Sequence, residues 1–342
     1  MQTRITKPDF LHDENGCLTA RGYATGLLLR YDRSRVKAPG WRLKEWDYYY
    51  VGNDNFGLAL TVADNGYMSM DSISLLDFDR NEQHTYSRIN VFPRRRGLPL
   101  TSERGDIRAQ GKDYEISFLN DGKQRQLFGH MDNFGKGKTL LFDLTLTDCP
   151  RDSMVIATPF AGKPRAFYYN QKINCMRAEG KVLWDGREYL FSPATAFAVL
   201  DWGRGVWTYD NTWYWGSASG IAGGRRFGFN IGYGFGDTSA ASENMLFVDG
   251  VAHKLSRVTF NIPIKDGKED YLSPWTFTSD DGRFEMDFSP MMDRSARIDL
   301  KLICSDQHQV FGRYTGKAVL DDGSVISVNG LTGFAEKVHN RW

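Results

Sequence analysis

Hydrophobic and polar residues alternate with a period of two along much of the chain. In the stretch 139–148, Phe142, Leu144 and Leu146 share one side of an extended strand, and the residues between them are Asp143 and Thr145. The same alternation returns in RFEMDFSP and in RIDLKLI further along the chain. This pattern predicts strands that bury one face.

The turn residues agree with this prediction. Asp-Gly begins at positions 121, 185, 249, 266, 281 and 322, and Asn-Gly at 15, 65 and 329. These dipeptides accept the positive φ angles of tight hairpin turns. No long amphipathic helix is evident, and one short helix is expected to begin at Ser192-Pro193. We therefore predict an all-β, antiparallel fold with little helix.

A weak internal repeat suggests how the strands are divided. WDYYY leads through a turn into FGLAL in the first half, and WYW leads into FGFNI in the second. The paired glycines, Gly57 and Gly228, lie 228 − 57 = 171 residues apart, which is half of the 342-residue chain. Two closed or paired sheets would remove exposed edges. We expect one β domain over residues 1–185 and a second over 186–342.

Composition and charge exclude several classes of protein. Hydrophobic residues make up 41% of the chain, enough for a large core, and the net charge of +1 argues against nucleic acid as a partner. The run Arg94-Arg95-Arg96 is more typical of a solvated loop than of an anion site. No apolar segment has the length of a signal or a membrane span.

The residues that would hold a metal or a cofactor do not form known patterns. Cys17, Cys149, Cys175 and Cys304 contain no C-x-x-C pair, which is typical of reduced thiols in a cytoplasmic protein. The six histidines show no zinc spacing, and Walker and dinucleotide fingerprints are absent. GYGFGD at 232–237 has glycines but no strand-to-helix context. We expect no cofactor and no metal.

Several stretches together resemble a known family. They are DWGRGVWTYDNTWYWGSASG, SENMLFVDGVAHKL, SPW, DFSP, HQVFG and GFAEKVHNRW. They resemble the bacterial domain of unknown function 2804 family, which is related to the AttH-like, carotenoid hydratase and tocopherol cyclase group. The resemblance implies two tandem lipocalin-like, or calycin-like, antiparallel β-barrels. It also implies an apolar isoprenoid or polyketide ligand, held in one barrel or between the two.

The aromatic stretch from Trp207 to Trp215 is the first candidate for a ligand pocket. Trp213 and Trp215 share one face of a strand. There they could form the floor of a pocket for an apolar or cationic ligand, or stack on a sugar. The alternative is that they pack in the core of a barrel. Carotenoid hydratases carry His-Gln-Trp-Gly at a similar place. Here Trp213 stands in place of that histidine, so the resemblance implies the pocket rather than hydratase chemistry.

Charged residues near these tryptophans are candidates for chemistry. Asp201 and Arg204, in DWGRG, could form an ion pair at a glycine turn, as a head-group anchor or as a structural clamp. Glu243, followed by Asn244, is a candidate acid, since a carboxyl among aromatic walls has a raised pKa. Its alternative role is a bond to the loop backbone.

Lys172 and Asn174 alternate onto one strand face and complete the candidate set. His308, Gln309 and Glu336 are buried polar candidates to which we assign a structural role. The predicted catalytic residues are Glu243 and Asp201. The predicted ligand-binding residues are Arg204, Trp207, Trp213, Trp215, Asn244, Lys172 and Asn174.

These observations lead to one hypothesis with two alternatives. The first is a cytoplasmic lipocalin-like protein that binds a mostly apolar, isoprenoid- or lipid-like small molecule and isomerises, hydrates or cyclises it without a cofactor. The second is a carbohydrate-active enzyme, in which Asp201, Asp210 and Glu243 supply paired carboxylates. The third is a non-catalytic carrier. The sequence leaves open whether the chain is an enzyme, its oligomeric state, and whether the cavity lies in one barrel.

Overall fold

The computed structural model describes residues 2–91, 96–299 and 304–341 and is nearly all-β. In these residues the helical elements are two 3-10 turns, η1 (Arg33–Arg35) and η2 (Gly40–Arg42). The predicted helix at Ser192 is wrong. That segment is a tight turn, in which the Ala196 N–H donates to the Ser192 carbonyl at 2.7 Å. None of the described helices is long and apolar enough to cross a membrane.

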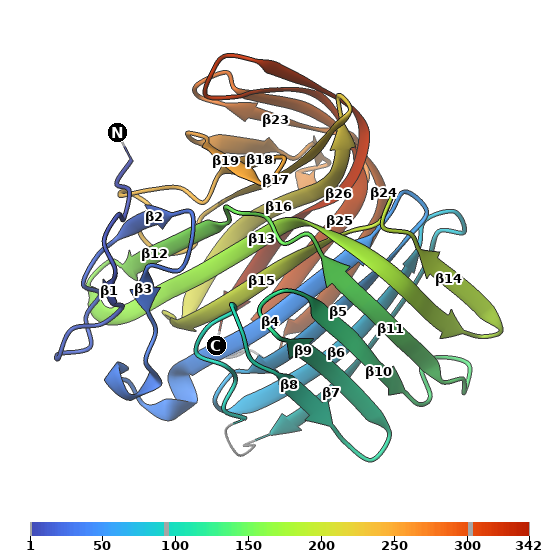
Figure 1. The fold of residues 1–342 in the computed structure, drawn as a ribbon, viewed down its shortest axis with the longest axis horizontal. Coiled ribbons are helices and arrows are strands. Elements are labelled where there is room, and N and C mark those ends of the chain that lie inside the picture. Colours follow the sequence, from blue (N-terminus) through green and yellow to red (C-terminus); the bar gives the residue numbers. More distant parts are fainter. Residues whose placement is uncertain (1, 92–95, 300–303, 342) are drawn as a thin grey trace.

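The first sheet has thirteen strands and curls around its own core (Figure 1). Its strands are β2 (Gly22–Ala24), β4 (Leu43–Gly52), β5 (Phe56–Asp64), β6 (Met68–Asp77), β7 (Glu82–Val91), β8 (Ile107–Gln110), β9 (Tyr114–Asn120), β10 (Arg125–Met131), β11 (Leu140–Thr147), β12 (Met154–Phe160), β13 (Lys163–Trp184), β14 (Arg187–Phe191) and β15 (Phe197–Val206). The main path runs β7-β6-β5-β4-β15-β13-β11-β10-β9-β8, while β12 and β14 pair with β13 and β2 pairs with β12.

The second sheet has nine strands in the order β19-β18-β17-β16-β26-β25-β24-β23-β20. They are β16 (Asp210–Ala222), β17 (Arg225–Tyr233), β18 (Met245–Val248), β19 (Val251–Lys254), β20 (Val258–Asn261), β23 (Trp275–Ser279), β24 (Phe284–Asp299), β25 (Cys304–Val319) and β26 (Val325–Arg341). Two small ribbons complete the fold: β1 (Asp9–Phe10) pairs with β3 (Leu29–Arg30), and β21 (Ile264–Lys265) pairs with β22 (Lys268–Glu269). The predicted all-β fold of two curled antiparallel sheets is confirmed.

The chain passes from the first sheet to the second between Val206 and Asp210. The two glycine-started strands of the internal repeat, β5 and β17, lie in different sheets, and each follows an aromatic strand, β4 or β16, with which it pairs. Strands β14 and β15 follow residue 185 and pair within the first sheet. The division into folding domains at 185 and 186 remains a prediction.

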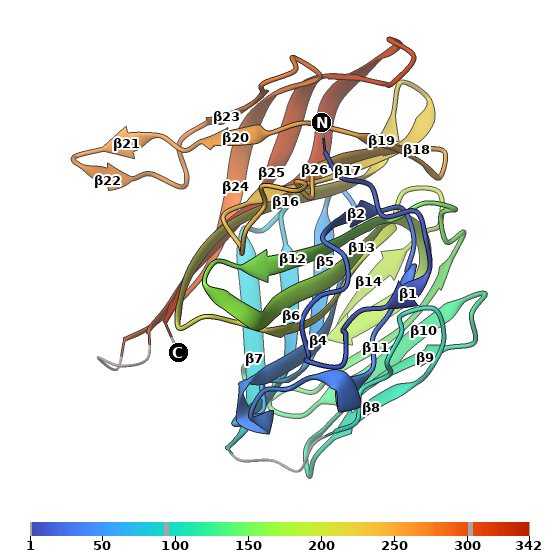
Figure 2. The ribbon, with the colours of Figure 1, turned by 90° about the vertical axis from the view of Figure 1, so that its left-hand side faces the viewer.

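A third layer of side chains lies between the two sheets, which face one another in Figure 2. Strand alternation creates this layer, because each facing strand turns one side to its own core and the other to the opposite sheet. In β15, Leu200 and Trp202 enter the first core while Val199 enters the middle layer. In β16, Ala218 enters the second core while Trp215 enters the middle layer. The candidate site is in this layer.

Candidate functional site between the two sheets

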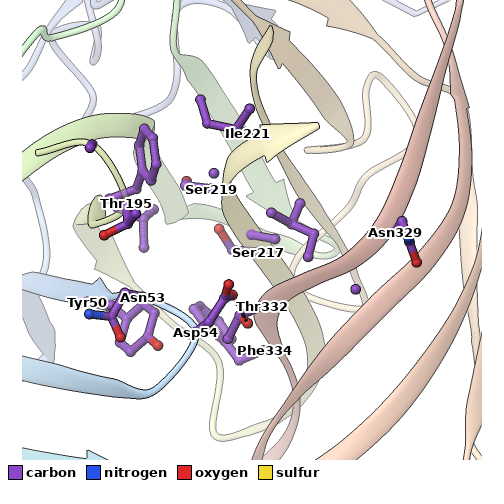
Figure 3. A pocket seen from close by; sticks show the side chains of 18 residues that line it. Tyr50, Asn53, Asp54, Thr195, Ser217, Ser219, Ile221, Asn329, Thr332 and Phe334 are labelled. Carbon is purple, nitrogen blue, oxygen red and sulfur yellow. Dashed lines mark hydrogen bonds between the residues drawn. The ribbon is translucent and has the colours of Figure 1, made fainter. Parts of the chain in front are cut away.

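A pocket of about 190 Å³ opens at one end of the layer between the sheets (Figure 3). It is lined from the first sheet by the β4 to β5 turn, the turn before β15 and the start of β15. From the second sheet it is lined by the end of β16 and by residues 329–334 within β26. Tyr50, Thr195, Ser217 and Phe334 mark its walls in Figure 3. Both sheets therefore build one cavity.

Four strands lead inward from this pocket to a buried polar cluster. Tyr50 of β4, Val199 of β15, Ser217 of β16 and Phe334 of β26 line the pocket. On each strand, the residue two positions further from the pocket has its side chain on the same face. These residues are Tyr48, Asp201, Trp215 and Glu336. All four are buried, with exposed fractions of 6–7%. A two-residue step advances about 7 Å along a strand, so the cluster lies one side chain behind the pocket.

The centre of the cluster is an ion pair between neighbouring strands of the first sheet. Lys172 Nζ lies 2.7 Å from Asp201 Oδ2, and Asn170 Nδ2 donates to Asp201 Oδ1 at 2.6 Å. The ammonium also lies 3.9 Å from the centre of the Trp215 ring. Both charged residues are buried, so solvent screens the attraction between their charges only a little. This cation is held between a carboxylate and an indole face.

Glu336 faces the same layer from the second sheet. Trp213 Nε1 donates to its Oε1 and Gln309 Nε2 donates to its Oε2, each at 3.1 Å. Burial raises the pKa of Glu336 to about 7, although the bond from Trp213 and the charge of Lys172 oppose the rise. This carboxyl can therefore hold or release a proton near neutral pH.

Glu243 reaches the cluster from the loop between β17 and β18. The side chain of Asn230 accepts from Trp215 Nε1 at 2.7 Å and donates to the Glu243 carbonyl at 2.8 Å. Burial raises the pKa of Glu243, Lys172 opposes the rise and Asp201 adds to it. The position opposite is Gly232, where a Cβ would lie 3.0 Å from the Glu243 carboxyl, so only glycine leaves it room.

Tyr168 of β13 completes the polar cluster. Burial raises the pKa of its hydroxyl well above the ordinary value. The charges of Glu243, Asp201 and Glu336 add to this rise. The phenol therefore stays protonated beside the carboxyl groups and is available as a hydrogen-bond donor. Together these side chains can bind a polar group and move a proton to or from it.

The structure brings most of the predicted site residues into this layer. Asp201, Lys172, Trp213 and Trp215 are in the polar cluster, and Glu243 is joined to it through Asn230. Trp213 and Trp215 both contact the middle layer, as strand alternation predicts. The functional roles of these residues stay predictions.

The other predicted residues lie around this cluster. Asn174 donates to Ser217 Oγ at 2.8 Å, beside the pocket. Trp207 packs against Trp213 in the same layer, with ring centres 6.0 Å apart. Asn244 accepts from the Gly232 N–H and donates to the Ser256 carbonyl, each at 2.7 Å, so it fixes the loop that carries Glu243.

The predicted ion pair between Asp201 and Arg204 is wrong. The two residues are three positions apart in strand β15, so their side chains point to opposite faces. The Arg204 side chain points into the core of the first sheet, where its Nη2 lies 3.1 Å from Asp47 Oδ1. The glycines that suggested a turn make space for indoles instead. A Cβ at Gly203 would lie 2.0 Å from the Trp46 ring, and one at Gly205 would lie 2.5 Å from Trp207 Nε1.

Four residues of this cluster were not predicted to be functional from the sequence: Glu336, to which we assigned a structural role, and Asn230, Tyr48 and Tyr168. Glu336 pairs in register with Trp215, although they are 336 − 215 = 121 residues apart. Strand alternation within GFAEKVHNRW puts Phe334 and Glu336 on one face, but the pairing of β26 with β16 depends on tertiary structure. Of the triple-arginine run, Arg94 and Arg95 lie outside the described residues, and Arg96 forms an ion pair with Asp71.

In the described part of the chain, no group of three or more His, Cys, Asp or Glu side chains is placed to hold a metal ion. The four cysteines are not paired with one another.

Comparison with known families agrees with the expected resemblance. A family model described as "Domain of unknown function (DUF2804)" matches residues 2–342. The chain belongs to the DUF2804 family. A comparison with curated protein sequences found no match.

Three solved structures are similar to this DUF2804 member. A protein described as a putative AttH from Nitrosomonas europaea is 15% identical with a TM-score of 0.54, covering 90% of this chain and 96% of that one. Kievitone hydratase from Nectria haematococca is 12% identical with a TM-score of 0.49, covering 97% and 98%. CghA, crystallised with Sch210972, is 10% identical with a TM-score of 0.49, covering 97% of each chain. The AttH likeness shows that the two-sheet architecture occurs in other proteins.

Proposed function

We propose that the layer between the two sheets binds a mostly apolar small molecule and transfers a proton to it without a cofactor. One observation carries this proposal: four strands from both sheets each place one residue on the pocket wall and the next same-face residue in the buried cluster. A ligand in the pocket would point its inner end at Glu336 and at the Lys172–Asp201 pair. Acid-catalysed isomerisation, hydration and cyclisation of an alkene each begin with such a proton transfer.

The size of the pocket limits what it can hold. Pockets for drug-sized ligands measure about 300–1,000 Å³, and this one measures about 190 Å³. It therefore accommodates one ring or a short branched chain rather than a whole polycyclic molecule. Tyr50 and Phe334 supply apolar walls, whereas Asn53 and Asp54 lie at the turn and provide polar contacts.

The cluster contains the parts that protonation of an alkene or a carbonyl requires. Glu336 is the first candidate donor, because its strand face continues from the pocket wall, and Glu243 is the second. A carboxyl with a pKa near 7 is matched to work at neutral pH. The cation that forms on the ligand would be stabilised by the neighbouring indole of Trp213. Asp201 would stay paired with Lys172, so that the charges of these two residues cancel.

The carbohydrate alternative has less support. A sugar platform needs an accessible indole face, but Trp215 is 6% exposed and one face of its ring contacts the Lys172 ammonium. Asp210, the other carboxylate of that hypothesis, is exposed and contacts His339 at 3.0 Å. A non-catalytic carrier differs from our proposal only in the absence of proton transfer, so an experiment can separate the two.

Deuterium uptake tests for that transfer directly. Protein purified from its native host would be extracted, and the small molecules recovered from it would be incubated with fresh protein in D₂O. We expect a recovered molecule to gain deuterium at carbon, and Glu336→Gln to slow the gain at least 100-fold, the typical contribution of a general acid. Glu188→Gln, which changes an exposed carboxylate far along β14, is the matched control and should retain the wild-type rate.

Two outcomes would contradict the proposal. If a recovered molecule binds but gains no deuterium, the protein is a carrier. If Glu336→Gln and Glu188→Gln take up deuterium at the same rate as wild type, the proton comes from elsewhere. Parallel measurement of Glu243→Gln shows which of the two carboxyl groups is the donor.

A further inference from the structure

The loop between β17 and β18 places one aromatic side chain in the layer between the sheets. Phe235 is 6% exposed and stands between Gly234, with φ of +93°, and Gly236, with φ of +72°. Residues on either side are on the surface: Gly234 and Ser239 are exposed. The loop therefore lies over the layer and points a single phenyl ring into it.

Four aromatic rings surround this phenyl ring. The ring centres of Tyr168, Trp207, Trp213 and Phe160 lie 4.8, 4.9, 5.2 and 5.4 Å from that of Phe235. Interplanar angles of 71–87° show that every contact is edge to face. Such contacts suit any planar apolar ring in the same place. We call Tyr168, Trp207, Trp213 and Phe160 the aromatic cage.

We propose that the aromatic cage is a second binding subsite, for a planar aromatic or conjugated group of the ligand, and that Phe235 occupies it when the ligand is absent. The proposal rests on the proposed function, since the same ligand would reach the same carboxyl groups. Beyond the proposed function, it gives the layer between the sheets a second entrance, and it requires the ligand to carry a planar group. The pocket of Figure 3 opens beside β4 and β26, whereas the cage lies under the β17 to β18 loop.

The cage is joined to the acid cluster by two of its own members. Trp213, one wall of the cage, donates its indole N–H to Glu336 at 3.1 Å. Tyr168, another wall, has its hydroxyl close enough to the three carboxyl groups for their charges to raise its pKa. A group that replaced Phe235 would therefore lie one side chain from the candidate proton donor.

The loop has the features of a movable cover. Glycines on both sides of Phe235 accept large backbone changes at small cost. Beside Phe235 the loop is held to β12, since Asp237 donates its N–H to the Pro159 carbonyl at 2.7 Å. Further along, it is held by the first residues of the chain: Ser242 donates its N–H to Gln2 Oε1 at 2.7 Å, and Thr3 donates its N–H to the Ala240 carbonyl at 2.8 Å.

Binding of 1-naphthol, a planar two-ring probe with one hydroxyl, tests this inference by isothermal titration calorimetry. Phe235→Ala should bind 1-naphthol at least 10-fold more tightly than wild type, because the cage is then empty. Phe229→Ala is the matched control, since Phe229 is a fully buried phenylalanine of the second barrel core. Phe229→Ala leaves a cavity of the same size, but the second core encloses it on all sides, so it cannot admit a two-ring probe and should give no gain. The cage, in contrast, borders the surface loop that carries Phe235 and can widen when that loop moves.

Further variants decide what the gain means. Adding Trp213→Leu to Phe235→Ala removes one cage wall and should weaken 1-naphthol binding at least 10-fold. Phe235→Leu, a milder change, should give an intermediate gain and serves if the alanine variant does not fold. The inference is overturned if Phe235→Ala and Phe235→Leu gain nothing, if Phe229→Ala gains as much, or if Trp213→Leu has no effect. These results concern binding alone, so they can fail or succeed independently of deuterium uptake.

Discussion

Replacing Glu336 with glutamine should reverse the order of stability between wild type and variant as the pH rises. The substitution keeps the shape of the side chain and removes its ability to ionise. One hydrogen bond is lost, because the amide oxygen can accept from Trp213 or from Gln309 but the new amide nitrogen can accept from neither. That loss costs about 1 kcal/mol at every pH.

The pH-dependent part follows from the raised pKa. In the folded protein Glu336 has a pKa of about 7 against an ordinary value of 4.5. Between these values the folded state holds a proton that the unfolded state has released, so wild-type stability falls as the pH rises through this window and then levels off. At about 1.4 kcal/mol per pH unit, the loss between pH 5 and pH 8 is about 2–3 kcal/mol. The Glu336→Gln variant has no ionisable group at this position, so its stability does not fall in this way.

Urea denaturation of both proteins at pH 5, 6, 7 and 8 measures the difference. We expect wild type to be more stable at pH 5 and Glu336→Gln to be more stable at pH 8, with the curves crossing between. The informative quantity is the slope of the difference, because the lost hydrogen bond shifts all points equally. Two parallel curves would refute the reasoning and would mean that Glu336 is ionised throughout in the folded state.

Two further substitutions separate the packing of the layer from that of the first barrel. Trp215→Ala should lower the free energy of unfolding by about 3–5 kcal/mol, measured by urea denaturation, because it leaves a cavity and removes the partner of Asn230; a loss below about 1 kcal/mol would contradict this. Arg204→Met should lower it by a similar amount, about 3–5 kcal/mol, because it leaves Asp47 buried and unpaired. Per folded molecule, native mass spectrometry should detect the same bound small molecule in Arg204→Met as in wild type, and its loss would restore a binding role to Arg204.

The alternation of the sequence predicted the strands and the shared face of Trp213 and Trp215, because side-chain direction along a strand depends only on local geometry. It could not show which face of a strand meets the other sheet. Asp201 and Arg204 illustrate this limit: their glycine neighbours indicated a turn, yet those glycines leave space for Trp46 and Trp207 inside a regular strand.

Glu336 illustrates a second limit. Its neighbour Trp215 is 121 residues away in sequence, and only the register between β16 and β26 brings the two together. Burial then raises the pKa of Glu336, and burial between two sheets is a property of tertiary packing. The pocket of the candidate site is lined by both sheets, which also follows from that packing.

The central claim is that the layer between the sheets binds a small apolar molecule, and native mass spectrometry of protein from its native host tests it most directly. Thr195 is exposed at the rim of the pocket, so Thr195→Trp should fill the pocket at little cost in stability. Thr278→Trp, at an exposed position on β23, is the control. We predict a bound small molecule in wild type and in Thr278→Trp and none in Thr195→Trp. Equal occupancy in all three proteins, or a wild type that carries nothing, would contradict the claim.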